Sequence, residues 1–203
     1  MAQSSVSDAQ MLNILDATMA VAVERSGSWL ACRPGCTPCC VGVFSISALD
    51  AERLSEGLTA LAATDPERAS AVLQRAASAR LRLAEDFPGD ATSGLLATDD
   101  EDFDERFADY ANDEVCPALD PASGLCDLYA ARPVTCRSFG PPVFSEEGVA
   151  VCELCFVDAA PEVIERAAVS LTEATELEEQ LTSVAEQRVS QIGQTLVAFA
   201  LKG

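Results

Sequence analysis

Cysteine is the residue type in this sequence that could do chemistry, because nine cysteines occur in 203 residues that contain no histidine. They form three clusters flanked by proline and glycine, namely Cys32, Cys36, Cys39 and Cys40, then Cys116, Cys126 and Cys136, then Cys152 and Cys155. The C-x-x-C units at 36–39 and 152–155 have the spacing that lets one short turn offer two thiolates to one metal ion. Thiolates select zinc, iron–sulfur clusters or Cu(I) over Mg²⁺ and Ca²⁺. We therefore predict that all nine cysteines are metal ligands.

The number of cysteines leaves the form of the metal site open. Nine thiolates could fill two Cys₄ sites with one spare, or a polynuclear cluster with bridging sulfurs, to which the adjacent Cys39 and Cys40 point. Disulfides are disfavoured because the count is odd and a cytosolic protein keeps its thiols reduced. Two alternatives without metal are cysteines buried as small apolar residues and a thioredoxin-type redox site, which would need a βαβ setting.

The overall composition excludes several classes of function. With 33 acidic and 13 basic residues, the formal charge is −20, and Lys202 is the single lysine. Nucleic acids and anionic membrane surfaces are therefore not expected as partners, whereas a protein partner stays open. The lack of histidine removes Ser-His and Cys-His catalysis. Whether the protein is an enzyme is left uncertain, with a role other than catalysis favoured.

The elements that must position the cysteines are helical. Apolar residues recur at helical spacing over 8–25, 48–86 and 161–201. Ser7 is the expected N-cap of the first segment, and Asp65 followed by Pro66 predicts a second helix start inside the middle segment. Nine acidic residues between 99 and 114 predict a solvated loop or short helix.

The fold expected from this pattern is mainly α, as a single domain over 1–203. Helices flank an irregular, loop-rich core ligated by cysteines over 30–157, with at most a short β-hairpin, expected over 143–151. Because these loops have little else to hold them, we expect folding to depend on the metal. No basic n-region precedes the first helix, and no apolar run reaches the roughly 20 residues of a transmembrane helix, so a cytoplasmic protein is expected.

Residues beyond the cysteines complete a resemblance to a known family. The spacing is Cys32-x₃-Cys36-x₂-Cys39-Cys40, then Cys116-Pro-Ala-Leu119, then Cys126-x₂-Tyr129-x₂-Arg132-Pro133-x₂-Cys136-Arg137. This pattern resembles the CxxCxxCC or YkgJ-type cysteine-cluster family, which is described as zinc- or iron-chelating, and it covers about residues 30–157. The first gap has one residue more than the strict family spacing. Members are mostly small bacterial proteins, and a related domain in flagellin lysine methylases implies an iron–sulfur possibility.

The resemblance implies a metal-binding protein of unassigned role, with zinc slightly favoured over an iron–sulfur cluster. The alternatives are an iron–sulfur protein for electron transfer or redox sensing, and an accessory subunit of a modifying enzyme. Arg132 and Arg137 could offset the negative charge of the thiolates and donate hydrogen bonds to sulfur. Tyr129 is expected to support the site as a packing residue, and Trp29 is expected in the core.

Overall fold

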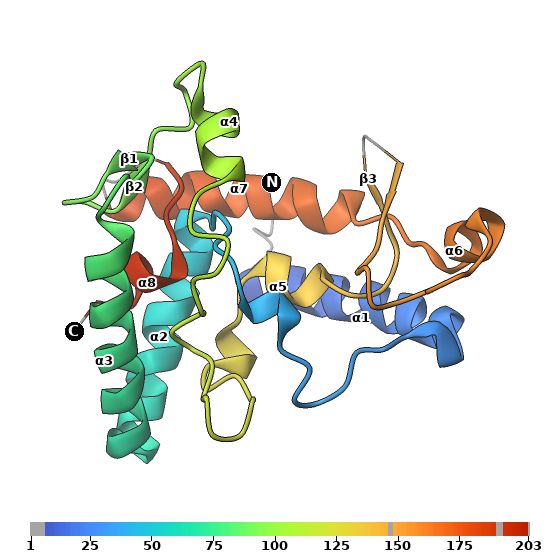
Figure 1. Ribbon diagram of the computed structural model, residues 1–203, viewed down its shortest axis with the longest axis horizontal. Helices are drawn as coiled ribbons and strands as arrows, with labels where there is room; N and C mark the ends of the chain where they lie inside the picture. The colour runs from blue at the N-terminus through green and yellow to red at the C-terminus, as the bar shows by residue number, and fades with distance from the viewer. Residues whose placement is uncertain (1–6, 146–147, 190–192, 203) are drawn as a thin grey trace, which may run out of the picture. The chain divides into compact units, whose positions relative to one another are not determined.

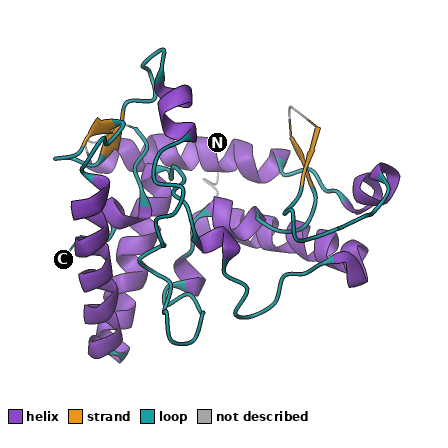
Figure 2. Ribbon diagram, viewed as in Figure 1, coloured by secondary structure: helices purple, strands orange, loops and turns teal. Residues whose placement is uncertain are grey.

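The computed structural model describes residues 7–145, 148–189 and 193–202, and these are mainly helical, as predicted (Figures 1 and 2). The chain forms two compact units. Unit 1 comprises Met1–Arg33 and Val134–Ser183, and unit 2 comprises Pro34–Pro133 and Val184–Gly203. The division does not test whether the chain folds as one domain, which stays a prediction.

Unit 1 is built on helix α1 (Asp8–Ser26). The helix begins where the sequence predicts, because the Ser7 hydroxyl accepts a hydrogen bond from the Gln10 amide and the Gln10 side chain accepts one from the Ser7 amide. Its buried face carries Met11, Leu15, Met19 and Ala22. Helices α5 (Val134–Ser138) and α6 (Pro161–Ala167) contact α1. A short 3₁₀ turn, Gly27–Trp29, follows it and leads into the first cysteine cluster.

The predicted hairpin of unit 1 is present. Strand β3 (Val143–Ser145) pairs antiparallel with β4 (Gly148–Ala150), with Val143 opposite Ala150. The two residues between the strands, 146 and 147, lie outside the described residues. The hairpin lies between the second and the third cysteine clusters of the chain.

The segment 161–201, where helical spacing is predicted, contains more than one helix. The described residues there form α6, α7 (Thr172–Val189) and α8 (Val197–Ala200), and residues 190–192 lie outside the described part. Val169 breaks the first stretch because its amide donates to Pro142 and its carbonyl accepts from Phe144. Thr195 likewise exchanges two backbone hydrogen bonds with Ile46. Both breaks come from backbone pairing with distant residues, which helical periodicity cannot show.

Unit 2 is organised by helices α2 (Ala48–Thr64) and α3 (Pro66–Leu83), which lie side by side (Figure 1). Ser47 caps α2, and Asp65 caps α3 by accepting from the Arg68 amide, with Pro66 at the first helical position. The predicted segment 48–86 is therefore two helices, and the start predicted at Asp65 is confirmed. The core between these helices and α8 is aliphatic and contains Ile46, Leu54, Leu58, Val72, Ala76, Leu128 and Leu201.

Small elements complete unit 2. Helix α4 (Phe103–Ala108) lies in the acidic segment, as one of the two predicted forms, and β1 (Gly89–Asp90) pairs with β2 (Leu95–Leu96). This second strand pair was not predicted, because two-residue strands leave no alternating pattern in the sequence. Two 3₁₀ turns, Pro38–Cys40 and Tyr129–Ala131, lie in the cysteine-rich segments. Among the described helices, none combines the length and apolar character needed to cross a bilayer.

Candidate metal centres

The two units divide the cysteines into two groups. Unit 1 contains Cys32, Cys136, Cys152 and Cys155, whereas unit 2 contains Cys36, Cys39, Cys40, Cys116 and Cys126. All nine lie in the described ranges, and none of them forms a disulfide. Only Cys155 is buried, while the other eight are partly or fully exposed. Most of these cysteines are therefore not small core residues, and their side chains are accessible to a ligand.

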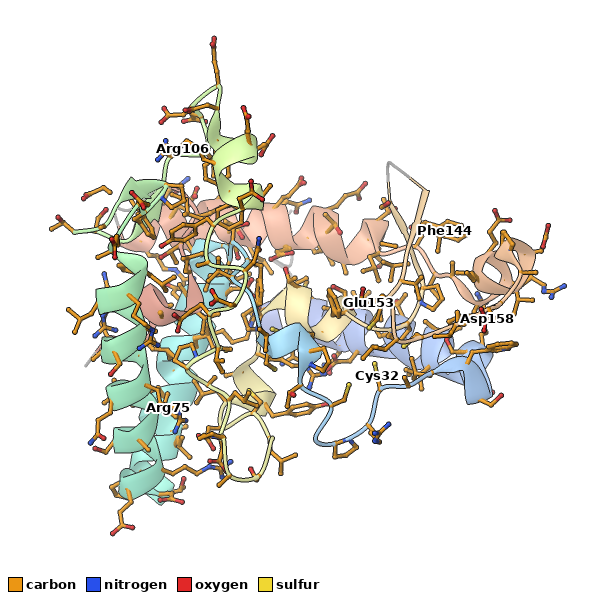
Figure 3. The ribbon with its side chains drawn as sticks, viewed as in Figure 1. Cys32, Arg75, Arg106, Phe144, Glu153 and Asp158 are labelled. Atoms are coloured by element: carbon orange, nitrogen blue, oxygen red, sulfur yellow. The ribbon has the colours of Figure 1, made fainter. Side chains whose placement is uncertain are left out.

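In unit 1 the sulfur atoms of Cys32 and Cys155 lie 4.0 Å apart (Cys32 is labelled in Figure 3). Tetrahedral zinc with zinc–sulfur bonds of about 2.3 Å separates two of its sulfurs by about 3.8 Å. A disulfide bond would need about 2.05 Å. The observed separation therefore suits two thiolates on one metal ion and does not suit a disulfide.

Backbone hydrogen bonds bring these two cysteines together. The Phe156 amide donates to the carbonyl of Trp29 at 3.0 Å, and the Ala31 amide donates to Cys155 Sγ at 3.4 Å. An N–H group directed at sulfur stabilises the thiolate form and orients it for a metal. The Cys155 amide also donates to the Cys152 carbonyl at 2.8 Å, which closes the turn of the last C-x-x-C unit. The segment before Cys32 thus runs beside the segment that carries Cys155.

Gly140 is a residue of this site that sequence reasoning missed. Its φ of 118° is a conformation that favours glycine, and a Cβ atom there would stand 2.6 Å from Cys32 Sγ. The Gly140 carbonyl accepts a hydrogen bond from the Cys152 amide at 3.2 Å. Cys136 lies four residues earlier, in α5. The signal in the sequence was a glycine before two prolines, closely following a predicted ligand.

In unit 2 the cysteines lie on neighbouring segments of irregular backbone. The Cys116 amide donates to the Cys40 carbonyl at 2.8 Å, beside the antiparallel bridge between Val41 and Val115. The thiols of Cys39 and Cys40 contact each other through a hydrogen bond. Cys126 pairs with Leu119 in a second bridge. These contacts gather Cys39, Cys40, Cys116 and Cys126 around two short antiparallel bridges.

The segment that carries Cys36 packs against the turn that leads to Cys126. A Cβ atom at Gly124 would lie 3.5 Å from the Gly35 Cα and 3.6 Å from the Thr37 Cγ2. The residues on both sides of Cys36 therefore pack against the turn that precedes Cys126. Contacts within unit 2 thus place the segments of all five cysteines beside one another.

A buried ion pair anchors two of these segments on α3. Arg75 donates from Nε to the Pro117 carbonyl at 2.8 Å and from Nη2 to Asp127 at 2.5 Å (Arg75 is labelled in Figure 3). The Asp127 side chain is 2% exposed and also pairs with Arg68. Because Pro117 and Asp127 follow Cys116 and Cys126 directly, Arg75 holds both cysteine segments. Sequence reasoning missed these residues, although Arg68 and Arg75 stand seven residues apart on one helical face.

The thiols of unit 2 differ in acidity. A hydrogen bond from Cys40, together with the positive charge of Arg132, lowers the pKa of Cys39 to about 6. Burial raises the pKa of Cys116 to about 11, and burial also raises the pKa of Cys126. Cys39 therefore offers a thiolate at neutral pH, whereas Cys116 and Cys126 must lose their protons to bind a metal.

The residues predicted to support the ligands lie in both units, with Arg132 and Tyr129 in unit 2 and Arg137 in unit 1. The Arg132 guanidinium lies 3.8 Å from the centre of the Tyr129 ring, and its charge favours the thiolate forms of Cys39 and Cys126. Tyr129 is 65% exposed, and the Arg132 guanidinium packs on its ring. Arg137, in unit 1, donates to Asp16 at 2.9 Å. The supporting roles of Arg132, Arg137 and Tyr129 stay predictions.

Trp29 is also more exposed than expected. Its side chain is 42% exposed, and its ring stacks on Phe156 with 6.1 Å between ring centres. The expectation of a core tryptophan is therefore wrong. The backbone hydrogen bond from Phe156 to Trp29 brings the two residues together, and their rings stack beside Cys155.

The chemistry of the donors fits a thiophilic metal. Within the described ranges, no three His, Cys, Asp or Glu side chains already converge on a point that could hold an ion. The fit therefore depends on the sulfur-only donor set, on the 4.0 Å separation of Cys32 and Cys155, and on the amide directed at Cys155. Zinc prefers such donors, and iron–sulfur clusters use them as well.

One family model matches the chain over residues 31–156, which is more than half of its length, and the family is described as "CxxCxxCC: Putative zinc- or iron-chelating domain". The chain belongs to this family. The matched region contains all nine cysteines, and membership of the CxxCxxCC family supports metal binding by this protein in general terms. No curated protein and no solved structure matches the chain.

Proposed function

We propose that this CxxCxxCC protein binds zinc through cysteine thiolates. The observation that supports this most is the 4.0 Å separation of the Cys32 and Cys155 sulfurs. Two thiolates on one tetrahedral zinc ion are separated by about 3.8 Å. In a [4Fe–4S] cluster each cysteine binds a different iron, so the cysteine sulfurs stand farther apart than sulfurs that share one ion. A site in which both thiolates share one metal ion therefore fits this pair better than a [4Fe–4S] cluster.

The metal serves mainly to hold irregular backbone together. The segment between α5 and α6 contains Cys152 and Cys155, and its described residues are regular only in the short β3–β4 hairpin. The buried cluster beside it is small, with Cys155, Phe156 and Ala167 as its buried members. A metal that crosslinks such loops contributes its binding free energy to folding. The proposed role is thus a structural zinc protein, and we place it in the reducing cytoplasm, where thiols stay available for metal.

A second candidate, an iron–sulfur protein for electron transfer or redox sensing, is favoured by one feature of unit 2. The adjacent thiols of Cys39 and Cys40 contact each other, and the hydrogen bond and Arg132 lower the pKa of Cys39 to about 6. In an iron–sulfur cluster inorganic sulfide bridges the irons and each thiolate binds one iron, so two adjacent thiolates can bind two irons of one cluster. This candidate needs the same cysteines and differs from the first in the metal that they bind.

Absorption spectroscopy of the purified protein separates the two candidates. Protein purified without oxygen should be colourless, should contain zinc and, after exchange with Co²⁺, should show the intense near-ultraviolet bands of cobalt–thiolate bonds. A matched control is the same protein alkylated at its cysteines before exchange, which should show no such bands. A brown protein that absorbs near 400 nm would support the iron–sulfur candidate instead.

A further inference from the structure

We infer that the two units carry separate metal sites, each completed by the cysteines of that unit. The first site consists of Cys32, Cys136, Cys152 and Cys155, and the second draws four ligands from Cys36, Cys39, Cys40, Cys116 and Cys126. This inference rests on the proposed function and adds to it the number of metal ions and the grouping of their ligands. It replaces the two arrangements that the sequence leaves open with one.

Unit 1 provides as many thiolates as a tetrahedral ion needs. A closed circuit of contacts links three of its four cysteines: Cys32 Sγ lies 4.0 Å from Cys155 Sγ, and the Cys155 amide bonds the Cys152 carbonyl. The Cys152 amide in turn donates a hydrogen bond to the carbonyl of Gly140. Gly140 lies against Cys32, because a Cβ atom added to it would stand 2.6 Å from Cys32 Sγ. Cys136 precedes Gly140 by four residues, in a helix that contacts α1. Four thiolates complete a structural zinc site without help from other donors.

A separate set of contacts links the cysteine segments of unit 2. Cys40 and Cys116 are joined across the bridge between their neighbours Val41 and Val115, and Cys126 lies on the strand-like segment that returns beside Leu119. Arg75 fixes the residues that follow Cys116 and Cys126 to the same helix. The residues flanking Cys36 pack on the turn before Cys126. Three separate segments thus meet within one unit, as they do in unit 1.

The Cys39–Cys40 pair explains why the total is nine. Cys36, Cys116 and Cys126 supply three ligands, and the pair supplies the fourth with one thiol to spare. The spare thiol contacts its neighbour. An odd count of cysteines is thus compatible with two complete tetrahedral sites.

Metal content of serine variants tests this grouping. Native mass spectrometry should find two zinc ions on the wild-type chain, one on Cys155→Ser, one on the double variant Cys116→Ser/Cys126→Ser, which leaves unit 2 with three thiols, and none on the triple variant. Loss of all metal from Cys155→Ser or from that double variant, or one shared cluster on the wild type, would overturn the inference. A wild-type chain that binds no metal would instead contradict the proposed function itself, so the two failures are distinguishable.

A second measurement on the wild-type chain avoids variants that fail to fold. The zinc-loaded protein is treated with increasing chelator, alkylated, and mapped by peptide mass at each step. The cysteines should become reactive in two groups, with Cys32, Cys136, Cys152 and Cys155 changing together. Release of all ligands in one step, or groups that mix cysteines of the two units, would contradict separate sites.

Discussion

The two cysteine groups differ in what supports them apart from metal. In unit 2, Cys116 and Cys126 pack against the aliphatic core, and a buried carboxylate with two arginines fixes their segments to α3. In unit 1, Cys155 belongs to a small cluster, and the chain around it is held by a few backbone hydrogen bonds. Under the proposed function, the metal would therefore add to an existing core in unit 2 and would replace a core in unit 1.

The largest expected effect follows from removing the metal. Structural zinc contributes roughly 10–16 kcal/mol to the folding of small domains that lack a core. We expect chelation to abolish amide protection around Cys152 and Cys155 in unit 1, and to leave α2 and α3 protected because their aliphatic core remains. Hydrogen exchange followed by mass spectrometry measures both regions in one sample.

Readdition of zinc provides the control for this experiment, since it should restore protection in unit 1. Equal loss of protection in both units would show that the difference in support does not matter. Unchanged protection throughout would show that the metal is not structural.

The next effect tests the close approach to Cys32. Gly140→Ala places a methyl group against Cys32 Sγ and strains a φ of 118°, which should destabilise unit 1 by about 3 kcal/mol. Gly148→Ala is the matched control, because Gly148 has a φ of 130° but nothing lies within 4 Å of its added Cβ. Thermal unfolding and zinc content measure the difference. Equal effects of the two changes would mean that only backbone strain, and not the sulfur contact, is involved.

A smaller effect is expected at the anchor of unit 2. Arg75→Ala removes the hydrogen bonds to Pro117 and Asp127 and leaves Asp127 buried, at a cost of about 2 kcal/mol. Arg68→Ala removes the more exposed partner of Asp127 and should cost less than about 1 kcal/mol. Denaturant unfolding of the zinc-loaded protein measures both. If Arg68→Ala were as costly as Arg75→Ala, the link to Pro117 would contribute nothing.

The smallest effect on stability concerns protonation of the metal-free thiols. Because Cys39 has a pKa of about 6, its contribution is complete at high pH and is lost as pH falls toward 6. Cys116 has a pKa of about 11, so its contribution is complete below its ordinary pKa and is lost as pH rises toward 11. At pH 7 we expect iodoacetamide to alkylate Cys39 on the order of 100-fold faster than Cys116. Similar rates, read by peptide mapping, would contradict these environments.

The parts of the fold that local residues determine could be predicted from the sequence. Ser7 and Asp65 with Pro66 mark helix starts because a cap depends on neighbouring residues alone. The hairpin at 143–151 also depends on short-range pairing. The break at Thr195 could not be predicted, because it depends on backbone pairing with the distant residue Ile46.

The same distinction applies to the candidate site. The cysteines and their family follow from residue type and spacing, and the family is confirmed. Their division between two units, the contact of Gly140 with Cys32, and the anchoring by Arg75 depend on which distant segments meet. No spacing along the chain indicates these contacts. The exposure of Trp29, which residue type alone predicted wrongly, has the same cause.

X-ray absorption at the zinc edge of the purified wild-type protein tests the central claim most directly. We expect a first shell of four sulfur atoms at about 2.3 Å, without nitrogen or oxygen ligands, because the chain has nine cysteines and no histidine. A shell of oxygen or nitrogen donors would contradict zinc–thiolate binding. So would a protein that holds iron in place of zinc, with iron neighbours around each iron atom.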